Sequence, residues 1–254
     1  MTRAIAVLCS IVVTLLAGAA GAAEIKVISA GAVRGLITGM IEDYSRQTGH
    51  KFDFTVGTTG QLRNIIASGR PADLIIASAP LMAELEKSGK ITPGSRADLG
   101  RVGIGVVIRD GAAAPDVSTP EALKQALIEA RSVTYTGPAE GGTSGVHVMN
   151  LLKQWGIAEL VEKKARHATG GRDTVEKVAR GEAEIGITLM SEIVHAKGAR
   201  LAAMLPEPIQ LWTVYAAAIP VSSTDAASAR AFISVLTGPA MAGRWKAAGF
   251  DPPK

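Results

Sequence analysis

Cysteine is nearly absent from the sequence, since Cys9 is the only one. It lies in the N-terminal stretch "MTRAIAVLCSIVVTLLAGAAGAAEIK", where one arginine precedes an apolar run and small residues follow, as in a secretory signal peptide. At about 15 residues the run is shorter than the roughly 20 that a membrane-spanning helix needs. We therefore expect residues 1–23 to be a cleaved signal peptide and the mature, disulfide-free chain to be periplasmic.

Aromatic residues make up only 4% of the chain, and the 27 basic and 23 acidic residues are spread along it. Both features argue against a nucleic-acid partner, which would need a basic stripe or a stacking surface. The four histidines stand far apart, so we expect neither a metal site nor a cofactor. The sequence also has no GxSxG elbow, and "GPAEGGTS" lacks the lysine of a phosphate-binding loop, so we expect no enzyme activity.

Strand-like and helix-like segments alternate from Ile25 to the C-terminus. "IKVISA", "DLIIAS" and "VGIGVVIR" read as buried strands, and "STPEALKQALIEA" reads as a helix with Ser118 or Thr119 as its cap and Pro120 in its first turn. Repeated β-α-β units predict an α/β fold with parallel-dominated sheets that are covered on both faces.

Glycine-rich turns separate several of these strands from the helices that follow, at 29–35, 56–61, 75–80, 136–145 and 169–174. The free N–H groups and the partial positive charge of a helix N-terminus suit an anion, and small residues let a ligand approach the backbone. A single turn of this kind is usually only a helix cap, but five in one chain favour a ligand site. The candidate residues are Gly31, Thr58, Thr59, Gly142, Thr143, Ser144 and Arg172, with Arg34 and His147 close to the turns.

Three segments resemble periplasmic molybdate-binding proteins, which are the solute receptors of ABC importers: "RPADLIIAS" (70–78), "GEAEIGITLMSEI" (181–193) and "FISVLTGPAMAGRWKAAGF" (232–250). The resemblance covers nearly the whole mature chain. It implies a two-lobed, type 2 periplasmic-binding-protein fold in which each lobe is a mostly parallel sheet flanked by helices and the ligand lies between the lobes. Lobe I would comprise 24–103 plus 214–254, and lobe II 104–213, with crossovers near 101–107 and 210–215.

The resemblance also places ligand contacts on five positions of this chain: Ala32, Thr59, Ser78, Gly171 and Leu189. Hydroxyl donors are usual in the family at three of them, and here Ala32 and Leu189 have none. Each missing hydrogen bond to a charged ligand costs on the order of 1.5–3 kcal/mol, so oxyanion binding would weaken by about a hundredfold unless "GGTSG" replaces the donors.

The sequence therefore predicts an extracytoplasmic solute-binding protein of an ABC transporter, which captures a small anion by hinge closure. Its partners would be that anion and an ABC permease in the inner membrane, and we expect a monomer. The loss of hydroxyls at Ala32 and Leu189, with Arg34 and Arg172 nearby, favours an organic carboxylate over molybdate, tungstate, sulfate or phosphate. The alternatives are a ligand-sensing accessory protein of a membrane receptor and an enzyme on the same scaffold.

Overall fold

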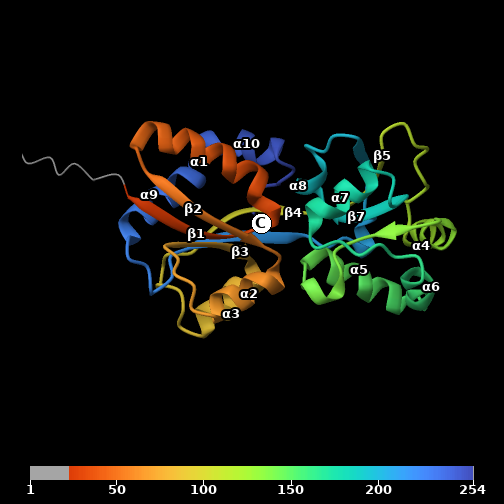
Figure 1. Ribbon diagram of the computed structural model, residues 1–254, viewed down its shortest axis with the longest axis horizontal. Coiled ribbons are helices and arrows are strands. Elements are labelled where there is room, and N and C mark those ends of the chain that lie inside the picture. Colours follow the sequence, from red (N-terminus) through yellow and green to blue (C-terminus); the bar gives the residue numbers. More distant parts are fainter. Residues whose placement is uncertain (1–22, 254) are drawn as a thin grey trace, which may run out of the picture.

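The computed structural model describes residues 23–253, in which two β-sheets with their own helices lie side by side (Figure 1). The predicted signal peptide lies outside the described residues, apart from Ala23. Among the described helices, none has the length and apolar character to cross a membrane.

The first sheet has five strands in the order β2-β1-β3-β9-β4, and we call it and its helices lobe I (23–102 and 213–253). Strand β1 pairs in parallel with β2 and β3, whereas β9 runs antiparallel to both β3 and β4. The strands are β1 (Glu24–Ala30), β2 (Lys51–Gly57), β3 (Leu74–Ser78), β4 (Ala97–Val102) and β9 (Thr213–Ala218).

The second sheet has four strands in the order β6-β7-β5-β8, and we call it and its helices lobe II (104–204). Only β6 and β7 are parallel, because β5 runs antiparallel to both β7 and β8. The strands are β5 (Ile104–Arg109), β6 (Val133–Thr134), β7 (Ile185–Leu189) and β8 (Ala199–Met204). The α/β class and the two lobes are as predicted, but the sheets are mixed rather than mostly parallel. Strands β9 and β5 enter their sheets from the other lobe, and each therefore runs against its neighbours.

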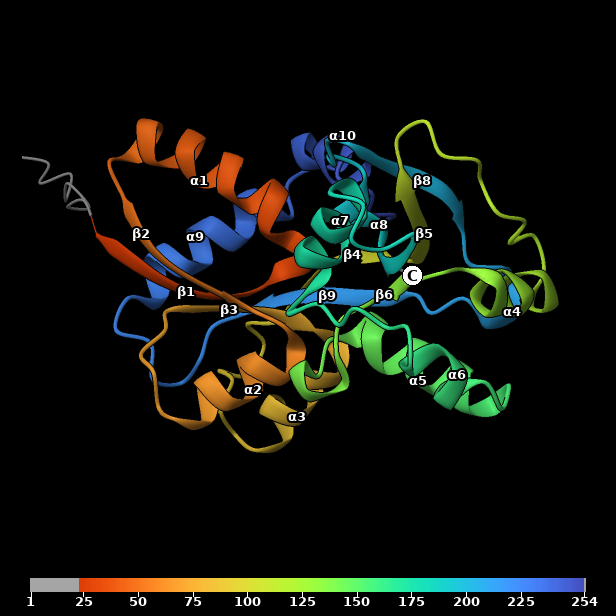
Figure 2. The ribbon, with the colours of Figure 1, turned by 45° about the vertical axis from the view of Figure 1, so that its right-hand side comes forward.

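Helices cover both faces of each sheet (Figures 1 and 2). In lobe I, α1 and α9 lie on one face and α2 and α3 on the other, while in lobe II α7 and α8 lie opposite α5 and α6. The helices are α1 (Arg34–Thr48), α2 (Thr59–Ala67), α3 (Ala79–Lys87), α4 (Pro120–Glu129), α5 (Thr143–Gln154), α6 (Ala158–Glu162), α7 (Gly171–Ala179), α8 (Met190–Ile193), α9 (Ala226–Leu236) and α10 (Ala242–Ala247), with single 3₁₀ turns η1 (Gly31–Val33), η2 (Pro138–Glu140), η3 (Glu207–Ile209) and η4 (Pro239–Met241).

Local sequence accounts for where these helices begin and end. Helix α4 starts as predicted, since the Thr119 side chain accepts a hydrogen bond from Ala122 N–H and Pro120 is the first helical residue. Helix α2 has a capping box, in which Thr58 and Gln61 each satisfy the other's backbone N–H. Helix α1 ends at Gly49, whose φ of 78° is the left-handed conformation that glycine adopts at helix ends.

The aspartate of "RPADLIIAS" has a structural role in lobe I. The buried Asp73 carboxylate accepts hydrogen bonds from Lys26 N–H (3.0 Å) on β1, and from Thr224 N–H (2.9 Å) and Asp225 N–H (3.1 Å) before α9. Burial alone would raise the pKa of Asp73, but these bonds hold the pKa below its ordinary value. Asp73 thus joins three segments that are far apart in the sequence.

The chain crosses between the lobes twice, at Gly103 and again over 205–212. The segment Val102–Arg109, which the sequence predicts to be one strand, is therefore divided at Gly103 between β4 and β5. The Gln210 side chain joins the two crossovers, because its Oε1 accepts from Ile104 N–H (2.8 Å) and its Nε2 donates to the carbonyls of Ile104 (3.0 Å) and Leu205 (3.2 Å). The sequence predicts lobe I at 24–103 plus 214–254 and lobe II at 104–213. We propose these as the boundaries of the two lobes, because both crossovers of the chain lie at or beside them.

Candidate anion-binding cleft

A cleft of about 320 Å³ opens where the two lobes meet. Of the residues predicted from the sequence, Gly31, Ala32, Thr58, Thr59, Gly142, Thr143, Ser144, Gly171, Arg172 and Leu189 all line it. Ser78 does not line it, but its hydroxyl lies 3.4 Å from that of Thr59. The glycine-rich turns of both lobes therefore converge on one cleft of a size suited to a small molecule.

A cluster of hydroxyl groups crosses the cleft. The hydroxyl of Thr143 at the start of α5 lies 3.2 Å from that of Thr59 at the start of α2, and Tyr215 from β9 lines the cleft close to Thr143. Tyr215 is buried, and burial together with the nearby Glu192 charge raises the pKa of its hydroxyl, against the lowering effect of Thr143. Tyr215 is therefore a neutral hydrogen-bonding group at neutral pH, and the sequence analysis did not find it.

Three hydrogen bonds join the two lobes beside the cleft. Thr58 Oγ1 donates to the Glu140 carbonyl, Gln61 Nε2 donates to Glu140 Oε2 (2.6 Å), and Gly60 N–H donates to the Gly141 carbonyl (3.1 Å). Thr58 also accepts the α2 capping bond, and its N–H donates to Gln61 Oε1, so its polar groups already have partners. In this structure the two lobes are therefore in direct contact, which is the arrangement that the expected hinge closure requires.

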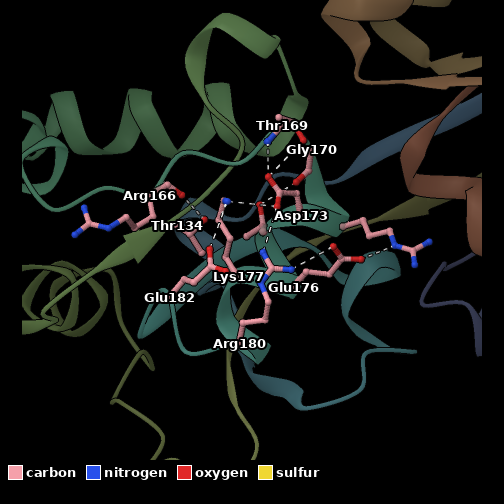
Figure 3. A network of polar contacts seen from close by, with 11 residues as sticks. Thr134, Arg166, Thr169, Gly170, Asp173, Glu176, Lys177, Arg180 and Glu182 are labelled. Carbon is pink, nitrogen blue, oxygen red and sulfur yellow. Dashed lines mark hydrogen bonds and ion pairs between the residues drawn. The ribbon is translucent and has the colours of Figure 1, made fainter.

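The start of α7 in lobe II is a helix N-terminus at the cleft, and its partial positive charge suits an anion (Figure 3). Asp173 Oδ2 accepts from Thr169 N–H (2.9 Å), and Lys177 Nζ lies 3.5 Å from Asp173 Oδ1, which together hold the preceding turn in place. A Cβ at Gly171 would lie 2.7 Å from Thr188 Oγ1, so the helix start approaches β7 more closely than any side chain would allow. The first N–H groups of α7 have no acceptor within the helix and are available to a ligand.

Two arginines line the cleft from opposite lobes, Arg34 at the start of α1 and Arg172 in the first turn of α7. Arg172 Nε donates to Glu176 Oε1 (2.8 Å), and this bond raises the pKa of the guanidinium. Two guanidinium groups on facing walls are suited to a ligand with two or more carboxylates.

Glu192 in α8 is the acidic group of the cleft that sequence reasoning missed. Its Oε1 would lie 3.5 Å from a Cβ at Gly31 in lobe I and 3.0 Å from one at Gly171 in lobe II, so it stands between the two glycine turns. Burial raises its pKa to about 7, although the charges of Arg172 and Arg34 both lower it. Glu192 lies three residues after Leu189, at the end of the segment 181–193, and no motif in the sequence singled it out.

Two of the three positions at which the resemblance implies hydroxyl donors are apolar, Ala32 and Leu189, and both are buried. The adjacent Thr188 hydroxyl is buried against the cleft and has no hydrogen-bond partner within 23–253. His147 takes no part in the cleft lining, because its Nε2 lies 2.7 Å from the Ile209 carbonyl oxygen. Within the same range, no three His, Cys, Asp or Glu side chains are grouped as a metal site would require.

The family model described as bacterial extracellular solute-binding protein matches residues 25–251. The chain belongs to this family. This solute-binding protein is 31% identical over 234 residues to an aconitate isomerase from a Pseudomonas species, covering 90% of this chain and 87% of that relative. It is 28% identical to the molybdate-binding protein ModA of Azotobacter vinelandii, with 93% of both chains covered. A solved structure of the periplasmic molybdate-binding protein of Azotobacter vinelandii superimposes with a TM-score of 0.75 at 22% identity, covering 91% of this chain and all of the other.

These comparisons confirm the predicted resemblance to molybdate-binding proteins and the type 2 periplasmic-binding-protein fold. This solute-binding protein therefore has an extracytoplasmic location typical of its family, and its cleft is the expected place for a small solute.

Proposed function

We propose that this solute-binding protein captures a small organic anion with two or three carboxylates and delivers it to an ABC permease. The observation that carries the proposal is the pair of arginines on facing walls of the cleft, combined with buried apolar residues at Ala32 and Leu189. Thr59, Thr143, Thr188 and the start of α7 supply further donors. An aconitate isomerase among the relatives acts, by its name, on a tricarboxylate, which supports the same ligand class.

Calorimetric titration of the ligand-free mature protein tests this proposal. We expect binding of trans-aconitate, citrate or tricarballylate, and weak or no response to molybdate, tungstate, sulfate and phosphate. Replacing Arg34 or Arg172 by glutamine should weaken carboxylate binding at least about tenfold, since a hydrogen bond to a charged group contributes about 1.5–3 kcal/mol. Arg230→Gln is the matched control, because Arg230 is exposed on α9 outside the cleft. Tight binding of molybdate with no carboxylate response would overturn the proposal.

A second candidate function is isomerisation of the bound ligand, and the observation that favours it is the carboxylate of Glu192 beside the anion site. Moving a double bond within an unsaturated polycarboxylate needs one base. The base removes a proton from carbon, the electron pair shifts the double bond, and the proton returns to another carbon. No nucleophile or cofactor is needed, so the lack of such motifs in the sequence does not bear on this reaction.

Proton NMR of cis- and trans-aconitate incubated with the mature protein tests this candidate. Interconversion that is lost in Glu192→Gln would support it. Binding of either isomer without interconversion over hours would leave a receptor and remove the enzyme.

A further inference from the structure

Glu192 occupies the part of the cleft where an anion is best stabilised. Its Oε1 lies beside Gly31, which precedes α1, and beside Gly171, which begins α7. The positive ends of both helices, and the two arginines, therefore face the same small region as this carboxylate. An anion held by these helix ends and arginines would lie against Glu192.

No hydrogen bond from the described residues contributes to the pKa of the Glu192 carboxyl group. Within the described residues, burial and the charges of Arg172 and Arg34 are the influences on its pKa, and no hydrogen bond is among them. The titratable and charged groups that line the cleft with it are Arg34 from α1, Arg172, Asp173 and Glu176 from α7, and Tyr215 from β9. Of these, Asp173 is held by Thr169 and Lys177, and Glu176 by Arg172 and Arg180, so both acids are already paired.

When two carboxylates share one desolvated site, their repulsion raises the pKa of one of them and favours its protonated form. We infer that Glu192 binds the ligand directly as a carboxylic acid, holding a proton between its own carboxyl group and a carboxylate of the ligand. This inference rests on the proposed capture of a carboxylate in this cleft. Glu192 thereby changes from a repulsive charge into a hydrogen-bond donor, and it supplies a donor on the lobe II wall where Leu189 has none.

Proton-linked calorimetry tests the inference with trans-aconitate as the probe. Titrations in two buffers of different ionisation enthalpy give the number of protons taken up on binding. Because the pKa of free Glu192 is raised to about 7, we expect uptake of about half a proton at pH 7 and nearly one at pH 8. Above pH 7 the affinity for trans-aconitate should decrease with rising pH, by up to about tenfold for each pH unit.

Glu192→Gln separates the inference from the proposed function. The amide keeps a donor but does not titrate, so proton uptake should vanish and the affinity should become constant between pH 6 and 8. At pH 8 the variant should bind trans-aconitate about tenfold more tightly than the wild type. Glu207→Gln, on the exposed turn η3, makes the same change in net charge outside the cleft and should behave like the wild type.

Binding of trans-aconitate without proton uptake, at an affinity independent of pH, would overturn the inference and leave the proposed function intact. It would mean that Glu192 stays ionised and turns towards Arg34 or Arg172. Absence of carboxylate binding at any pH between 6 and 8 would overturn both. Cooperative thermal unfolding of each variant, at or above the melting temperature of the wild type, establishes that it is folded.

Discussion

Replacing Gly60 by alanine is expected to hold the two lobes apart. A Cβ there would lie 2.8 Å from the Glu140 carbonyl oxygen and 3.0 Å from the Gly141 Cα, and both are backbone atoms that no rotamer change can move. Reaching the 3.4 Å of an ordinary contact needs a shift of about 0.6 Å, which stretches the 3.1 Å hydrogen bond from Gly60 N–H to the Gly141 carbonyl beyond useful length. Losing that bond and straining the adjacent contacts should destabilise the closed state by about 1–2 kcal/mol, and ligand affinity should fall about five- to thirtyfold.

Small-angle X-ray scattering measures the closure directly, and calorimetric titration with trans-aconitate measures the affinity. The Gly60→Ala protein should have a larger radius of gyration than the wild type at saturating ligand. Gly243→Ala in α10 is the control, since a Cβ there meets nothing within 4 Å. If Gly60→Ala matched the wild type in both scattering and affinity, the contact between Gly60 and Glu140 would not be part of the closed state.

Three further changes test other parts of the structure. Asp73→Asn should lower the free energy of unfolding by about 1–3 kcal/mol at pH 7 in a denaturant titration. The loss should be smaller at pH 3, because the stability that the depressed Asp73 pKa contributes begins to disappear as pH falls below the ordinary pKa of an aspartate. Equal losses at both pH values would contradict this. Gln210→Ala should lower the melting temperature, since the Ile104 N–H and carbonyl lose their partner at the crossover, and an unchanged melting temperature would show that water replaces it. Glu192→Gln should raise the free energy of unfolding of the ligand-free protein by about 1–3 kcal/mol at pH 8 and hardly at pH 4. The reason is that the raised pKa of Glu192 makes its ionised form, which predominates above pH 7, destabilise the folded state. A stability gain that did not grow with pH would count against that pKa.

Sequence reasoning predicted most of the fold because its signals are local. Apolar periodicity and caps such as Thr119 and Pro120 placed the helices near their observed positions. The same reasoning joined Val102 to Arg109 in one strand, since β-branched residues run on both sides of Gly103. The division appears only when each half pairs with its own sheet, and the antiparallel entry of β5 and β9 likewise depends on the crossovers.

The sequence predicted which glycine-rich turns line the candidate site, but not which of its polar groups already have partners or that Glu192 lies there. Glycine-rich turns identify helix starts from neighbouring residues alone, so the cleft wall around Thr59, Thr143 and Gly171 could be anticipated. The engagement of Thr58 by Glu140 joins residues 82 positions apart, and no pattern near Thr58 announces it. Glu192 was missed because a glutamate in a short helix usually faces solvent.

The sequence by itself determined the α/β alternation, the glycine turns that precede helices, and the family to which the chain belongs, because these depend on residues a few positions apart. The tertiary structure alone decided which polar groups are already satisfied and which face the ligand. Desolvation also belongs to the folded state, since the Glu192 pKa is raised only where both lobes bury the same carboxylate. Glu192 looks like an ordinary surface glutamate in the sequence. Only its burial in the folded protein makes it the group that we infer shares a proton with the ligand.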